Sequence, residues 1–450
     1  MKGAILESLV AAGMSAAEGE PKRELFERAE RVLASLRGEV PGEPRRWFVP
    51  GRIEVFGKHT DYAGGRSLLG ALERGLCVAA APREDNLLRV ADAQSGLTVE
   101  IGLGRADEEK RAAADWTLYV RTVARRLARN FPGALAGVDL AVASDLPRAA
   151  GLASSSALLT AIFTAVAERN RLAAHPAYCR AIASPAELAG YLGAMENGRD
   201  FGPLAGEAGV GTFGGSEDHT AILCCRAGCL SQFSFCPVRA ERVVRLPEDW
   251  AFVVGVSGVV AEKKGGAREA YNRAALAAEA ILELWQTATQ RSDASLAAAV
   301  GSGPDAASRL RHLLGRAAHP AFSTEQLLER FEQFYEESEV LVREAAEAIA
   351  RGDMAALARL TERSQAGAKR GLGNQVAETI ALARQARELG AAAAAFGAGF
   401  GGSVWALAPR GGASAFCAEW ARGYREKFPG RAATCEFFIS GAGPGLTRLS

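Results

Sequence analysis

The sequence lacks any apolar run long enough to span a membrane, and residues 1–36 are charged and patterned as a helix rather than as a signal peptide. An excess of charge of one sign is also lacking, because 53 Lys and Arg residues nearly balance 52 Asp and Glu residues. The net charge of +1 gives no reason to expect nucleic acid or an acidic membrane surface as a partner. We therefore expect a cytoplasmic protein that binds neither nucleic acid nor a membrane.

The eight cysteines lack the paired Cys-x-x-Cys spacing of a zinc site. Cys224, Cys225 and Cys229 lie in or beside the apolar run 221–225, which the pattern predicts as a strand and which has no histidine set nearby. We interpret these cysteines as reduced core thiols in preference to zinc ligands, because free cysteine is among the most buried residue types.

The chain has 450 residues, of which 48% are apolar, and this is enough for two lobes. We place the boundary near residue 240, with one lobe over 1–240 and the other over 241–450. The runs of alanine are interpreted as helix, because alanine has the highest helix propensity. Apolar periodicity predicts helices over 25–36, 116–131, 185–197 and most of 267–388, and strands over 47–55, 230–235 and 251–256.

The most informative stretch is 146–157, with the sequence LPRAAGLASSSA. A strand-like segment, 137–142, precedes it, and an apolar helical pattern starts at Leu158. A strand, a loop of small residues and a helix in this order point backbone N–H groups and a helix N-terminus at an anion. The loop has no Gly-Lys-Ser/Thr, so it is not a Walker loop. Taken alone, its three serines would be interpreted as an ordinary N-cap cluster.

Three further segments surround this loop. Residues 49–65 (VPGRIEVFGKHTDYAGG) contain a cation and an acid, residues 214–219 (GGSEDH) contain two acids, and residues 397–402 (GAGFGG) are rich in glycine. In this order the segments resemble those of the GHMP kinases, the galactose, homoserine, mevalonate and phosphomevalonate kinases. Residues 49–65 are most similar to the galactokinase signature.

This resemblance implies a two-lobed α+β fold, with an N-terminal lobe like domain 2 of ribosomal protein S5 and a ferredoxin-like C-terminal lobe of helices and a sheet. It implies an ATP-dependent kinase that phosphorylates the anomeric hydroxyl of galactose or of a related hexose or hexuronic acid, with ATP and Mg²⁺ bound. Nucleotide and sugar would meet in the cleft between the lobes. No sequence feature indicates an oligomeric state.

The resemblance also assigns the reacting groups. Asp218 would take the proton of the sugar hydroxyl or orient that hydroxyl, and Arg52 would offset the charge of the transferring phosphoryl group. Taken alone, Asp218 would be interpreted as a turn or cap acid. Its position between a glycine-rich segment and an apolar run favours the catalytic role.

For the nucleotide, Trp116 is expected at the adenine, although an aromatic residue on a helix is usually core. Ser156 and Glu196 are the expected magnesium ligands, because Mg²⁺ prefers hard oxygen donors. Glu196 could equally be an exposed residue at a helix end. The residues expected at the phosphates are Gly151, Leu152, Ala153, Ser154, Ser155, Ser156, Ala157, Gly399 and Gly401.

For the sugar, Asp61 can accept hydrogen bonds from two adjacent hydroxyls. The alternative is an Asx turn with a packed tyrosine. The residues expected to bind the sugar are Lys58, His59, Asp61, Tyr62, Gly214 and Tyr271.

Three positions depart from the galactokinase pattern. Glu54 replaces an asparagine, Lys58 replaces a glutamate and His219 replaces a glutamine. Because lysine favours a carboxylate, Lys58 suggests a substrate such as a hexuronic acid. Alternatively, Lys58 pairs with Glu54 and specificity for a neutral sugar is retained.

The sequence disfavours two other functions. A galactokinase-like sugar sensor without activity would be expected to have a damaged serine loop, whereas residues 151–157 are complete. A kinase for a mevalonate-like or amino-acid alcohol is disfavoured by residues 59–62, which resemble the sugar-kinase branch.

Overall fold

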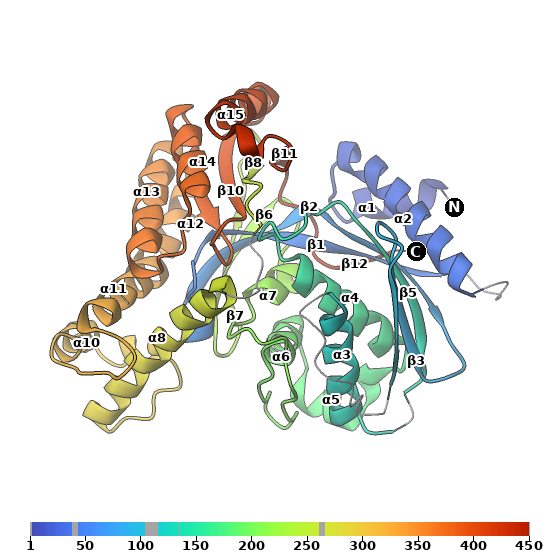
Figure 1. Cartoon of the computed structure of the whole chain (residues 1–450), viewed down its shortest axis with the longest axis horizontal. Helices are drawn as coiled ribbons and strands as arrows, with labels where there is room; N and C mark the ends of the chain where they lie inside the picture. The colour runs from blue at the N-terminus through green and yellow to red at the C-terminus, as the bar shows by residue number, and fades with distance from the viewer. Residues whose placement is uncertain (1, 38–43, 104–115, 134, 261–265, 450) are drawn as a thin grey trace.

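Two β-sheets organise the molecule (Figure 1). The computed structural model describes residues 2–37, 44–103, 116–133, 135–260 and 266–449. The first sheet has the order β12-β1-β2-β5-β3-β4, and β6 and β7 extend it from one end of β2. Its strands are β1 (Arg45–Phe56), β2 (Arg66–Pro82), β3 (Leu87–Asp92), β4 (Thr98–Gly102), β5 (Val138–Ser144), β6 (Cys229–Ser234), β7 (Arg239–Arg245) and β12 (Thr447–Leu449).

Strand β2 shows how the first sheet is covered on both faces. Leu76, Val78 and Ala80 belong to the core on the side of the later helices, whereas Ala79 and Ala81 pack under α2. Helix α7 is followed by β6, which pairs with β2. The helices of this lobe are α1 (Lys2–Ala11), α2 (Ala16–Arg37), α3 (Thr117–Asn130), α4 (Ser154–Arg169), α5 (Pro176–Ala181), α6 (Pro185–Asn197) and α7 (Glu217–Cys224).

The second sheet has the order β11-β8-β10-β9 and is antiparallel throughout. Its strands are β8 (Trp250–Val256), β9 (Ala392–Phe396), β10 (Ser403–Pro409) and β11 (Glu436–Ser440). The helices of this part are α8 (Gly266–Thr289), α9 (Leu296–Val300), α10 (Ala306–Leu314), α11 (Thr324–Tyr335), α12 (Val342–Ala350), α13 (Met354–Gly371), α14 (Ala377–Glu388) and α15 (Ala413–Lys427). A π-helical turn, Glu336–Leu341, joins α11 to α12.

The long periodic segments form the predicted elements. The helices over 25–36, 116–131 and 185–197 are confirmed as α2, α3 and α6, and the strands over 47–55, 230–235 and 251–256 as β1, β6 and β8. Strand β7 spans residue 240 and stays in the first sheet, and β8 starts the second. Among the described helices, none is both long and apolar enough to cross a bilayer.

Two local predictions are wrong. Residues 221–225 belong to α7 and its end instead of forming a strand, because a short apolar run carries no clear period. Residues 391–395 lead into and form β9 instead of a helix. Each of these five alanines is at most 3% exposed, so close packing against α13 and α14 outweighs the helix propensity of alanine.

Candidate active site

A cavity of about 460 Å³ lies where β1 and the turn after it, the serine loop (residues 151–157) and the glycine loop after β9 (residues 397–402) meet. Of the residues that the structure describes, Lys58, Ala157, Gly399 and Gly401 do not line it, although the sequence predicted them at the ligands. The predicted site residues that do line it are Arg52, His59, Asp61, Tyr62, Trp116, Gly151, Leu152, Ala153, Ser154, Ser155, Ser156, Glu196, Gly214, Asp218 and Tyr271.

Arg52 and Asp218 form an ion pair in this cavity, with Arg52 Nε 2.8 Å from Asp218 Oδ1. Arg52 comes from β1 and Asp218 from the first turn of α7. Burial lowers the pKa of the Arg52 guanidinium, but the nearby carboxylates of Asp218 and Glu217 outweigh this effect and raise it. The guanidinium therefore stays charged although it is buried.

Carbonyl groups in and just before the serine loop accept hydrogen bonds from Arg52 and Ser403. Arg52 donates from its side chain to Gly151 O at 2.7 Å and from its backbone N–H to Leu152 O at 3.2 Å. Ser403, at the start of β10, donates to Ala150 O at 2.7 Å. The first-turn N–H groups of α4 have no acceptor within the helix and can serve an anion. The first turn of α4 has no acidic residue that would oppose one.

Beside the loop, three helices bring a polar cluster together. Ser156 Oγ lies 2.9 Å from Glu196 Oε2 and 3.2 Å from Asp218 Oδ2. His219 Nε2 lies 2.9 Å from the same oxygen of Glu196, and His219 Nδ1 lies 3.1 Å from Thr160 Oγ1. Glu196 is 6% exposed, so the alternative of an exposed residue at a helix end is wrong.

The same cluster offers hard oxygen donors of the kind that Mg²⁺ binds. In the described parts of the chain, no group of three or more His, Cys, Asp or Glu side chains is arranged to hold a metal. A magnesium ion at Ser156 and Glu196 would therefore need the phosphate oxygens of a nucleotide to complete its coordination. The donor set fits a metal that arrives with its nucleotide.

Apolar and aromatic side chains also line the cavity, and aromatic side chains are the type on which planar bases stack. Trp116 and Tyr119 come from the start of α3, and Leu97 precedes β4. Leu97 is 59% exposed, which is unusual for leucine and leaves its side chain available for contact.

The turn after β1 supplies the predicted sugar-binding side chains. Asp61 Oδ2 accepts the backbone N–H of Glu217 at 3.0 Å, and Tyr62 Oη lies 3.1 Å from His59 Nδ1. Burial raises the pKa of Asp61, and the hydrogen bond from the Glu217 N–H acts against this rise. Burial also raises the pKa of Tyr62 to about 12, so its phenol stays protonated.

Gly214 lies beside Tyr271, since a Cβ on Gly214 would be 2.9 Å from Tyr271 Oη. Gly214 was expected at the sugar, but its N–H donates to Asn197 Oδ1 at 2.8 Å. Asn197 also donates to Gly215 O at 3.2 Å and so ties the end of α6 to the segment before α7.

The glycine loop after β9 contributes differently from expectation. Gly397 and Ala398 line the cavity, whereas Gly399 lies against Asn374 and Gly401 against Val259. Both glycines have positive φ angles of 80° and 129°, so they shape the turn and do not contact the ligand space.

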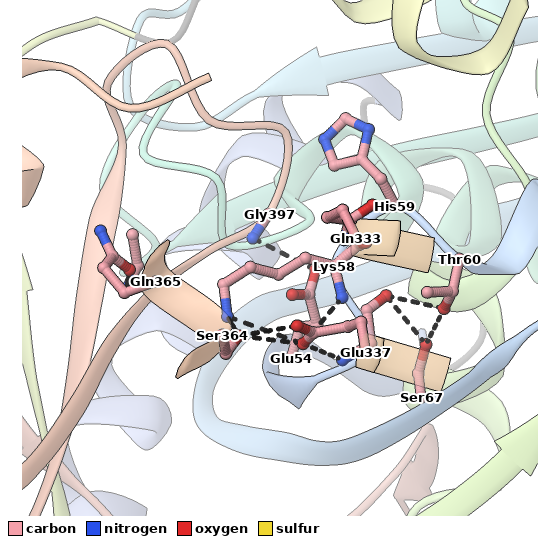
Figure 2. Close-up of polar contacts among 12 residues, drawn as sticks. Glu54, Lys58, His59, Thr60, Ser67, Gln333, Glu337, Ser364, Gln365 and Gly397 are labelled. Carbon is pink, nitrogen blue, oxygen red and sulfur yellow. Dashed lines mark hydrogen bonds and ion pairs between the residues drawn. The ribbon is translucent and has the colours of Figure 1, made fainter. Parts of the chain in front are cut away.

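Lys58 points away from the cavity and is 1% exposed. Its Nζ donates to Ser364 Oγ at 2.7 Å and lies 3.9 Å from Glu337 Oε1 (Figure 2). Lys58 therefore has Glu337 as its ion-pair partner within 4 Å. Its charge also acts on Glu54, where it lowers the pKa that burial raises, in keeping with the alternative that Lys58 pairs with Glu54.

The sequence did not indicate four residues that shape the site. Glu217 is 3.4 Å from Arg52 and accepts a hydrogen bond from Ser67 at 2.8 Å. Arg330, Gln333 and Glu337 contact the sugar-binding turn from α11 and the turn that follows it. Their spacing of three and four residues places polar groups on one helix face, a signal that marks a face but does not identify its partner.

Comparison with known proteins agrees with this geometry. Three family profiles match the chain: the galactokinase galactose-binding signature over residues 38–82, the GHMP kinases N terminal domain over 118–196 and the GHMP kinases C terminal region over 345–426. A galactokinase of Roseiflexus sp. is 28% identical over 411 residues, which are 89% of this chain and 92% of that protein. A galactokinase of Chloroflexus aurantiacus is 40% identical over 114 residues, 25% of this chain and 28% of that protein.

The crystal structure of Lactococcus lactis galactokinase complexed with galactose has the same fold. The two structures match with a TM-score of 0.75 over 95% of this chain and 100% of that chain, at 23% sequence identity. This chain contains the galactokinase signature and matches both GHMP kinase domain profiles, and it is galactokinase-like. It is a sugar kinase, a phosphotransferase whose acceptor is an alcohol group. The predicted family and the two-lobed α+β fold are thereby confirmed.

Proposed function

We propose that the protein transfers the γ-phosphoryl group of ATP to the anomeric hydroxyl of galactose, giving galactose 1-phosphate and ADP. The observation that carries this proposal is the 2.8 Å pair of Arg52 and Asp218, which lies between the serine loop and the sugar-binding turn. Because ATP is the donor, we place the reaction in the cytoplasm.

Each polar group has a role in this transfer. Asp218 accepts the proton of the anomeric hydroxyl as the hydroxyl oxygen bonds to the γ-phosphorus, and the bond from that phosphorus to the bridging oxygen of ADP breaks. Arg52 offsets the charge on the transferring group. The first turn of α4 binds the phosphates, and Ser156 and Glu196 hold the magnesium ion. When bound, that ion neutralises phosphate charge.

The sugar is proposed to be neutral. Asp61 accepts from two adjacent hydroxyls, with His59, Tyr62 and Tyr271 around the ring. The one cation that suggested a hexuronic acid, Lys58, is paired with Ser364 and Glu337 behind the turn. Four acids line the cavity around Arg52 and disfavour a substrate carboxylate by repulsion: Glu54, Asp61, Glu217 and Asp218.

The test is a coupled ADP-release assay with Mg²⁺ and ATP against galactose, glucose, galacturonate and glucuronate. We expect turnover of galactose and none of the uronates. Asp218→Asn should lower kcat by roughly 10² to 10⁴, because the amide cannot accept the proton. Glu84→Gln, which changes an acid whose side chain is 98% exposed, is the matched control and should keep full activity.

Turnover of a uronate alone would contradict the neutral-sugar assignment. Binding of galactose by the wild type without any phosphorylation would replace the kinase with a sugar sensor.

A further inference from the structure

The backbone of the sugar-binding turn is held by side chains of the second lobe. Glu337 Oε1 accepts the N–H of Gly57 at 2.9 Å and that of Lys58 at 3.4 Å. Gln333 Nε2 donates to Lys58 O at 2.9 Å. Glu337 is 1% and Gln333 3% exposed, so water does not compete for these hydrogen bonds.

His59 follows directly and has a φ of 57°, which is uncommon for a residue with a side chain. Such a conformation persists only where its surroundings impose it. Arg330, 1% exposed, donates to His59 O at 2.7 Å and to Tyr62 Oη at 3.1 Å. The fixed backbone therefore sets where the His59 ring stands in the cavity.

Lys58 completes a hydrogen-bond network behind this turn, as Figure 2 shows. Its ammonium group donates to the Ser364 hydroxyl at 2.7 Å, and this hydroxyl lies 2.9 and 3.0 Å from the two oxygens of Glu337. Glu337 in turn accepts the backbone N–H of Lys58 itself. The Lys58 side chain therefore orients the Glu337 carboxylate through Ser364. That carboxylate in turn holds the backbone N–H of Lys58.

The π-helical turn makes a second contact, at the end of the loop between β1 and β2. Ser338 follows Glu337 directly, and its hydroxyl accepts the N–H of Arg66 at 3.0 Å. Consecutive residues of an α-helix point about 100° apart. The wider π-helical turn makes this angle smaller, so Glu337 and Ser338 can both face the loop between β1 and β2. A buried carboxylate in such a place needs a countercharge, and Lys58 is the one within 4 Å among the described residues.

We propose that Lys58 is a positioning residue for the sugar: it orients Glu337, and Glu337 holds the turn that carries His59 and Asp61, without any contact between Lys58 and the substrate. The consequence for the reaction rests on the proposed galactokinase function. The mechanical part, that Lys58 holds the turn through Glu337, stands without it.

The test compares Lys58→Met, Glu337→Gln and the double variant. Lys58→Met leaves Glu337 without its countercharge, and we expect the KM for galactose to rise at least tenfold while the KM for ATP stays within twofold. In the double variant the neutral amide oxygen at position 337 can still accept the N–H of Gly57. We expect it to recover the KM for galactose to within threefold of the wild type. Lys369→Met, an exposed lysine on the same helix as Ser364, is the control.

A second readout does not depend on activity. Backbone hydrogen exchange in a peptide spanning residues 53–62 should be at least tenfold faster in Lys58→Met and return toward the wild-type rate in the double variant. An unchanged KM and exchange rate in Lys58→Met would overturn the proposal, as would a double variant no better than Lys58→Met. If the wild type phosphorylates no sugar, the proposed function fails, and the exchange comparison still decides the role of Lys58.

Discussion

At the scale of single residues, four carboxyl groups lie around the guanidinium of Arg52 in the cleft. Glu54, Asp61, Glu217 and Asp218 all act on the charge of Arg52. Burial raises the pKa of Glu54 to about 7, although Lys58 and Arg52 act against this rise. Burial and the nearby Glu54 raise the pKa of Glu217 well above its ordinary range. The cluster therefore holds a proton at neutral pH instead of ionising completely.

This bound proton makes stability depend on pH. Because the pKa of Glu54 is raised from about 4.5 in the unfolded chain to about 7 in the folded one, the folded state binds more protons between these values, and stability falls as pH rises through them. Glu54→Gln should remove this loss and be more stable than the wild type at pH 8 by roughly 1–3 kcal/mol. Urea unfolding at pH 5 and pH 8 measures the difference.

Glu84→Gln should leave that pH dependence unchanged, because its carboxylate is exposed in both states. An equal loss of stability with pH in Glu54→Gln and the wild type would show that Glu54 ionises freely.

The residues of the site could be predicted from sequence where their chemistry is local. Arg52, Asp61 and Ser156 lie in short motifs, and the structure brings all three to one cavity. The direction of the Lys58 side chain could not be predicted, because it is set by Glu337 and Ser364, about 280 and 306 residues further along the chain. No local pattern contains that information.

At the scale of elements, the start of α7 is fitted closely to the sugar-binding turn. A Cβ on Gly215 would lie 2.3 Å from Asp61 Oδ2 and 2.8 Å from the N of Tyr62. Only a residue without a side chain allows this approach. Gly215 is therefore required because it leaves room for Asp61, and not because its own backbone needs an unusual conformation.

Gly215→Ala should displace Asp61 and raise the KM for galactose at least tenfold, while the KM for ATP changes little. Steady-state kinetics with each substrate varied in turn measure this. Gly411→Ala is the matched control, since a Cβ there meets nothing within 4 Å. A KM for galactose within twofold of the wild type would mean that Asp61 is not held at the sugar by this contact.

Elements of clear period could be predicted, and short apolar ones could not. Helix α3 has the repeat of an amphipathic helix. Helix α6 has a Ser-Pro start, and Ser184 accepts the N–H of Glu187. By contrast, α7 has only eight residues, too few for the repeat to show. Strand β9 consists of four alanines and a phenylalanine, and its pairing with β10 and its packing against α13 and α14 decide its conformation.

At the scale of the whole molecule, β12 joins the end of the described chain to its beginning. It pairs with β1, with Phe48 opposite Thr447 and Arg46 opposite Leu449. Leu449 is 5% exposed and shares a small core with Phe26, Phe48 and residues of α1. The first lobe is therefore completed by residues that follow the whole second lobe.

Leu449→Ala should lower the free energy of unfolding by about 2–4 kcal/mol, the usual cost of a cavity at a buried leucine. The KM values should stay unchanged, because this core lies outside the cleft lining. Denaturant unfolding measures the loss. Leu389→Ala, at a leucine that is 36% exposed, should cost much less, and equal costs would show that Leu449 is not packed as described.

The two-lobed fold could be predicted from the order of the motifs, but the return of β12 could not. Three residues carry no periodic signal, and their pairing partner is about 400 positions earlier. The family resemblance supplied the architecture, while apolar patterning alone would have left β1 as an edge strand.

Pairing between β12 and β1 also sets an order of events during synthesis. At about 5–20 residues per second, a ribosome needs on the order of 20–80 s after completing β1 to reach residue 449. For that time the hydrogen-bonding edge of β1 next to Phe48 has no partner of its own. An open edge invites pairing with other chains, so a nascent first lobe needs shielding until its last strand arrives.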